Sequence, residues 1–78
     1  MSEPGPDIQT LVRRGHAYAR RGEYLKAAEA FTGAVDLDPA DADLYFFRGN
    51  AHAAAGRYSE AVDDFTHAIE LRPDYAAA

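Results

Sequence analysis

The sequence contains no cysteine, so neither a disulfide framework nor a thiolate metal site can stabilise its fold. It has only 4 prolines and 6 glycines among 78 residues, which leaves long stretches free to form helix. No apolar run is long enough for a transmembrane helix. Residues 1–7 carry neither a basic patch nor an apolar segment, so we expect no secretory signal and a cytoplasmic location.

The composition that remains is typical of one small globular domain. Hydrophobic residues make up 47% of the chain and charged residues 27%, a balance that disordered chains lack. The net charge of −5 argues against non-specific binding to nucleic acid or to an anionic membrane. Residues 1–26 have five basic and three acidic residues, a net +2, whereas residues 27–78 have three basic and ten acidic residues, a net −7. The two halves therefore differ in sign along the chain.

An internal repeat organises the sequence. When the chain is shifted by 34 residues, segment 8–41 aligns with segment 42–75 and twelve positions are identical. The identities include paired glycine, tyrosine, phenylalanine and proline, which an alanine-rich composition does not readily produce by chance. A fixed period of about 20–50 residues is the pattern of a repeat architecture.

Each repeat predicts two helices, and those of the second repeat cover residues 42 to about 55 and 58 to about 71. Glycines stand where the first helix would end in a left-handed residue, prolines follow the second helix, and aspartates precede the first helix as N-caps. These pairs are Gly22 and Gly56, Pro39 and Pro73, and Asp7 and Asp41.

Apolar residues recur every three or four positions along the second helix of each repeat, which predicts one buried stripe per helix. The stripes are Tyr24, Ala27, Ala28, Phe31, Ala34 and Val35, and then Tyr58, Ala61, Val62, Phe65, Ala68 and Ile69. A glycine inside a helix costs about 1 kcal/mol relative to alanine. Because Gly15 and Gly49 repeat at the same position, we expect them to allow close helix contact beside Phe31 and Phe65.

These residues resemble the tetratricopeptide repeat signature, which matches residues 8–75 twice. The first match is carried by Gly15, Tyr18, Ala27, Phe31, Ala34 and Pro39, and the second by Tyr45, Gly49, Ala61, Phe65, Ala68 and Pro73. Leu11 stands where the family often has tryptophan, and His52 stands where it prefers a large apolar residue. The resemblance implies an all-α fold of two antiparallel helix-turn-helix units forming a short right-handed solenoid. The expected organisation is a flexible tail over 1–7, a first unit over 8–41, a second unit over 42–75, and the start of a further helix or a truncated end over 76–78.

The resemblance also implies a non-catalytic module that binds a peptide or protein segment on a concave face. The positions that it places there are Gln9, Val12, Arg13, His16, Arg20, Asp43, Phe46, Phe47 and Asn50. One hypothesis is a groove for an acidic peptide, in which arginines bind carboxylates and a phenylalanine forms the apolar contact. The alternative is that Arg13 and Arg20 are solvated surface charges. In that case the rings of Phe46 and Phe47 are both buried by the next unit.

No catalytic, cofactor or metal site is predicted. The histidines at 16, 52 and 67 have no metal-ligand spacing, and we expect His52 to be partly buried and His67 to face solvent. Asp63 and Asp64 are adjacent in a predicted helix, so their side chains point about 100° apart. They therefore predict a charged face rather than an acid/base pair.

The second helix of the second unit leaves an apolar edge that includes Val62, Phe65 and Ile69. Either the chain is a piece of a longer array, or it associates with itself at high concentration, as a structural scaffold unit would. The opposite charges of its two halves favour head-to-tail stacking, and domain exchange through the turn at Gly22 or Gly56 is another way to bury the same edge.

Overall fold

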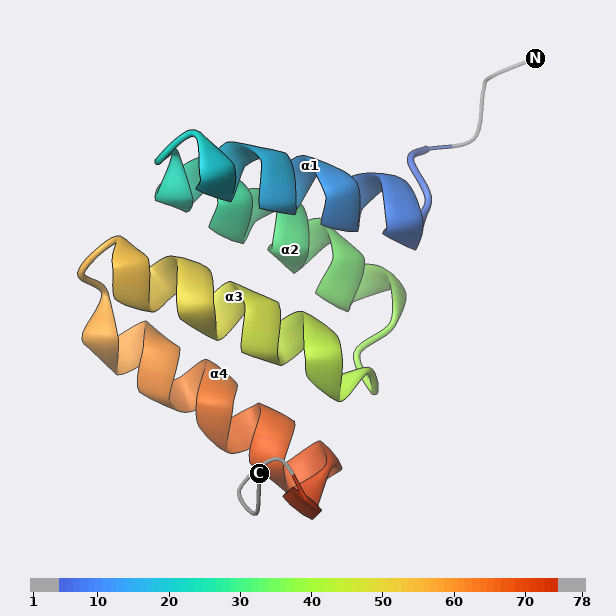
Figure 1. The fold of residues 1–78 in the computed structure, drawn as a ribbon. Helices are drawn as coiled ribbons and strands as arrows, with labels where there is room; N and C mark the ends of the chain where they lie inside the picture. The colour runs from blue at the N-terminus through green and yellow to red at the C-terminus, as the bar shows by residue number, and fades with distance from the viewer. Residues whose placement is uncertain (1–4, 75–78) are drawn as a thin grey trace.

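The computed structural model describes residues 5–74, which form helices joined by short turns (Figure 1). The helices are α1 (Ile8–Arg20), α2 (Tyr24–Leu37), α3 (Ala42–Ala54) and α4 (Tyr58–Leu71). They confirm the all-α class and the two helix-turn-helix units that the repeat predicts. Of the predicted tail over 1–7 only residues 5–7 are described, and the predicted helix start over 76–78 lies outside the described residues. Within residues 5–74, no helix has both the length and the apolar character needed to cross a membrane.

The residues predicted to begin and end the helices do so. The Asp7 carboxylate accepts a hydrogen bond from the Thr10 backbone N–H at 2.8 Å, and Asp41 caps α3 by accepting one from Asp43 at 3.0 Å. That backbone bond is the main cause that lowers the pKa of Asp7 below its ordinary value of 3.8. Gly22 and Gly56 have φ angles of 77° and 82°, the left-handed conformation that closes α1 and α3.

The helical glycines provide close contact inside each hairpin, as predicted. A Cβ atom added at Gly15 would lie 2.5 Å from the Phe31 ring, and one added at Gly49 would lie 2.7 Å from the Phe65 ring. Both distances are too short for a real carbon contact, so the phenylalanine occupies the space that a side chain would need. Phe31 is only 2% exposed, which makes it one of the most deeply buried large side chains.

The helices pack in chain order, each against the next, so that α2 and α3 form the middle of the stack (Figure 1). The buried core lies around these two helices in two clusters. One contains Ala34, Val35, Leu44, Tyr45 and Ala68, and the other contains Ala27, Ala28, Phe31 and Ala51. Because α2 packs between α1 and α3, its apolar stripe is covered on both sides.

The prediction that Asp63 and Asp64 form a charged face is wrong for Asp64, which is buried. Asp64 is 4% exposed and accepts hydrogen bonds from Arg48 Nη2 at 2.7 Å and Arg48 Nε at 3.0 Å. The His52 Nε2 atom lies 3.6 Å from the same carboxylate. Asp64 stands one turn from both Ala61 and Ala68, on the side of α4 that packs against α3, where a carboxylate needs a charged partner. His52 is half-buried as predicted.

Candidate functional site

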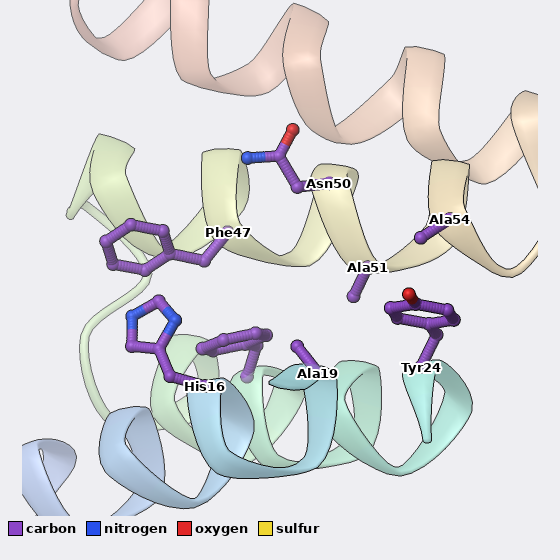
Figure 2. Close-up of a pocket in the computed structure, with 8 residues that line it drawn as sticks. His16, Ala19, Tyr24, Phe47, Asn50, Ala51 and Ala54 are labelled. Carbon is purple, nitrogen blue, oxygen red and sulfur yellow. The ribbon is translucent and has the colours of Figure 1, made fainter. Parts of the chain in front are cut away.

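A pocket of about 270 Å³ opens between the two hairpins (Figure 2). Its lining comes from three helices and consists of His16, Ala19, Tyr24, Phe31, Phe47, Asn50, Ala51 and Ala54. Figure 2 shows the His16 and Phe47 rings facing each other at one end and Tyr24 lying below Ala54 at the other. Ala19 and Ala51 lie between these two ends, where their small side chains leave space.

The rings at the first end of the pocket hold one another in place. The His16 ring centroid lies 4.7 Å from that of Phe47 and 5.2 Å from that of Phe31, and both pairs meet edge to face. The two phenylalanine centroids are 5.6 Å apart. Such edge-to-face arrangements are the preferred geometry of aromatic pairs, so the three rings form a packed aromatic wall at this end of the pocket.

A second, more open pocket of about 380 Å³ adjoins the first, because Phe47 lines both. It is lined by Ile8, Gln9, Val12, Arg13, Asp41, Asp43, Leu44 and Phe47. We call the two pockets together the α1–α3 groove. The groove is therefore apolar and aromatic at one end and more polar at the other.

The charges near the groove are mainly positive on its α1 side. Arg13 and Arg20 are both exposed, and α1 contains no acidic residue. Arg13 donates a hydrogen bond to the Thr10 hydroxyl at 3.4 Å, which is a long contact on an exposed surface. On α3, the Asp43 carboxylate forms an ion pair with Arg72 at 3.1 Å. Asp43, the acidic residue predicted for the concave face, is thus paired with an arginine.

Most of the residues predicted for the concave face lie along this groove. His16, Phe47 and Asn50 line the first pocket, and four others line the second, namely Gln9, Val12, Arg13 and Asp43. Arg20 lines neither pocket. Phe46 is also absent from both: its ring centroid is 5.7 Å from that of Phe65, and it lines a separate hollow with residues of α4. Adjacent residues point about 100° apart on a helix, so Phe46 and Phe47 face different neighbours.

Two aromatic residues that line the first pocket, Tyr24 and Phe31, were not predicted for the site. Their spacing marks them as core residues, and Phe31 is indeed buried. Nothing in the sequence separates a core ring whose edge borders a pocket from one that is wholly enclosed. Tyr24 shows this well, because its repeat counterpart Tyr58 is 69% exposed whereas Tyr24 is half-buried.

Of the residues predicted for the self-association edge, Val62 and Ile69 are exposed on α4, whereas the Phe65 ring packs against Gly49 of α3. Val62 is 61% exposed and Ile69 is 42% exposed, while Phe65 is half-buried. This edge is separate from the α1–α3 groove, since none of these residues lines either of its pockets.

The histidines lie at three separate places. His16 is part of the groove wall, His52 is beside Asp64, and the exposed His67 ring stacks on Tyr45 with centroids 4.7 Å apart. Among residues 5–74, no three histidine, aspartate or glutamate side chains come together as metal ligands.

Two helix hairpins packed in chain order, with a groove between their first helices, define a helical-repeat protein. A family model of the tetratricopeptide repeat matches residues 12–76, and the chain belongs to this family. Members of the family generally mediate protein–protein interactions and are typically non-catalytic. No curated protein sequence matches the chain.

Proposed function

We propose that this chain is a non-catalytic interaction module whose α1–α3 groove binds a peptide or a segment of another protein. Membership of the tetratricopeptide repeat family supports an interaction role in general. The observation that carries the assignment to the groove is the aromatic pocket of about 270 Å³ between α1 and α3.

The size and lining of this pocket favour a peptide side chain as its occupant. Small-molecule sites have volumes of about 300–1,000 Å³ and enclose most of their ligand. The present pocket is at the lower limit, about 270 Å³, and is open on one side. An aromatic or branched aliphatic side chain would fill it against Phe31, Phe47 and Tyr24, and burial of a large ring is the usual source of binding energy at such contacts.

One polar side chain at the pocket, that of Asn50, can form hydrogen bonds with a peptide backbone. A bound peptide needs partners for its backbone N–H and C=O groups. Asn50 is exposed at the pocket, and its amide can both donate and accept a hydrogen bond.

The charges favour an acidic segment. Arg13 and Arg20 are seven positions apart on α1, so both lie on one side of the helix, and both are exposed. Guanidinium groups bind carboxylates through charge-assisted hydrogen bonds. The preferred partner is thus a segment with one large apolar residue and nearby aspartate or glutamate.

Selection from a random peptide library displayed on phage tests this function, followed by fluorescence anisotropy of the enriched peptides. We expect enrichment of sequences with one large apolar residue near acidic residues. Phe47→Ala should weaken their binding about 30-fold, since it removes a wall of the pocket. Leu25→Ala is the matched control, because Leu25 is 49% exposed on α2 and lines neither pocket.

The acidic preference is tested separately from the groove. Arg13→Ala and Arg20→Ala should each weaken binding about threefold, and added salt should reduce that difference. If neither variant changes the affinity, the two arginines are solvated charges and the preference for acidic partners is wrong. If Phe47→Ala binds as well as the unaltered chain, the groove itself is the wrong site.

A further inference from the structure

One face of α4 carries the repeat counterparts of the α2 residues that pack against α3. Ala28, Phe31 and Val35 on α2 are between 2% and 7% exposed and belong to the buried clusters that join α2 to α3. Their counterparts 34 residues later are Val62, Phe65 and Ile69. Val62 and Ile69 are 61% and 42% exposed. The face is thus built to hold a helix of the α3 kind.

The charges of α1 and α4, the first and last described helices, are opposite in sign. α1 contains three arginines and no acidic residue, whereas α4 contains four carboxylates and neither lysine nor arginine. The buried Asp64 binds Arg48, but Glu60, Asp63 and Glu70 are exposed. Two α4 helices placed side by side would bring these carboxylates together, and facing like charges disfavour such a contact. An α1 helix brings arginines instead.

The α2–α3 contact inside the chain supplies a template for such an arrangement. Across it, Arg48 Nη1 on α3 donates a hydrogen bond to the Thr32 hydroxyl on α2 at 3.3 Å. The repeat counterparts of these residues are Arg14 on α1 and Thr66 on α4, and both are exposed. The partners of one hydrogen bond are therefore repeated on the first and the last of the described helices.

We propose that α4 of one copy binds α1 of a second copy, head to tail, in the arrangement by which α2 holds α3. The contact places Arg14 of the second copy against Thr66, with Asp63 and Glu70 within one turn of Thr66 along α4. It also places Ala17 of the second copy against Val62, because the counterparts Ala51 and Ala28 belong to the same buried cluster. This interface is a different surface from the two pockets of the α1–α3 groove, although Arg13 lines the groove and also lies on the face of α1 that would meet α4.

The composition of α1 sets the strength of this contact. Where α3 buries Leu44, Phe47 and Ala51, α1 offers the more polar set Thr10, Arg13 and Ala17. Less apolar surface is buried, and ion pairs supply more of the attraction. The association is therefore weak, needs a high protein concentration, and weakens about tenfold between low salt and about 1 M salt, where the screening length falls to about 3 Å.

Two variants that each block one end test the arrangement by sedimentation velocity over a wide concentration range. Val62→Glu blocks the α4 face, and the double variant Arg14→Glu/Ala17→Glu blocks the α1 face. None of these residues lines the groove. Circular dichroism confirms that each variant folds, and anisotropy with a groove-binding peptide reports on the other function independently.

The unaltered chain is expected to form a ladder of species, and each variant alone to remain monomeric. An equimolar mixture should give a dimer and nothing larger, because one free α4 face meets one free α1 face. The proposal is overturned if the α1-blocked variant still dimerises alone, since that indicates pairing of two α4 faces. It is equally overturned if the mixture stays monomeric or if the unaltered chain shows no association.

Discussion

The two units differ most where Arg48 meets Asp64. In the second unit a buried carboxylate on α4 accepts hydrogen bonds from an arginine on α3, and His52 lies beside the pair. At the equivalent places the first unit has Arg14, Ala30 and Tyr18. Its arginine is exposed, and its helices are joined by apolar and aromatic packing around Phe31. The same hairpin is thus held together with a buried ion pair in one unit and without one in the other.

The two units also differ in how their second helices are covered. The second helix of the first unit packs between two neighbours, whereas α4 packs mainly on α3 among the described helices. A buried ion pair adds little stability relative to apolar packing, but it strongly penalises arrangements that separate its charges. We infer that Asp64 fixes the position of α4 on α3, where less apolar contact is available to do so.

The largest expected effect on the free energy of unfolding comes from truncating Phe31 and its repeat counterpart Phe65. Phe31→Ala should lower the free energy of unfolding by about 3–4 kcal/mol, because it empties a fully buried site. Phe65→Ala should cost about 1–2 kcal/mol, because Phe65 is half-buried. Urea unfolding followed by circular dichroism at low protein concentration measures both. Equal losses would mean that the face of α4 is covered in solution.

The next effect concerns the buried carboxylate. Asp64→Ala should cost about 2–3 kcal/mol, because Arg48 and His52 lose their common partner in a site that remains largely buried. Asp63→Ala is the matched control on the adjacent, exposed position and should change the stability by less than about 0.5 kcal/mol. A similar loss in both variants would show that the pair contributes only as surface charge.

A smaller effect is expected when the ion pair is built into the first unit. Ala30→Asp places a carboxylate at the position equivalent to Asp64, with Arg14 at the position equivalent to Arg48. We expect a loss of under about 1 kcal/mol, since Arg14 can pair with the new charge, and a loss of about 2 kcal/mol in Ala30→Asp/Arg14→Ala. The double-mutant cycle in urea gives the coupling energy. A coupling of zero would show that the two hairpins differ in geometry as well as in sequence.

The smallest expected effect is the pH dependence of the Asp7 cap at the start of α1. The pKa of Asp7 is lowered in the fold, so its cap stabilises α1 above the ordinary pKa of 3.8, and this contribution is lost as pH falls through the folded value. NMR titration of the Asp7 carboxyl should show a midpoint below 3.8, together with faster amide exchange at Thr10 in acid. Asp7→Asn should remove this pH dependence. A midpoint at the ordinary value would contradict the cap.

Much of the fold could be predicted because its signals are local. The capping aspartates and the left-handed glycines act within a turn of where they stand and mark the ends of α1 and α3. The 34-residue repeat predicts a second helix in each unit, and α2 and α4 are found there. Gly15 was also predictable, since a glycine repeated inside a helix implies a close neighbour. The candidate site was predictable only in outline. His16, Phe47 and Asn50 meet at one pocket, whereas Phe46 lies elsewhere and Phe31 joins the lining.

The sequence by itself determined the class of fold, the family and the helix faces, because helical periodicity and repeat spacing are properties of residues close together in the chain. Only the tertiary structure decided which side chains meet across helices. Arg48 and Asp64 are sixteen residues apart, and their spacing along the chain does not predict that they pair. The burial of Asp64, the separation of two adjacent phenylalanines and the pocket beside His16 all depend on how closely one helix packs on another. That distance is set by the summed packing of the whole stack.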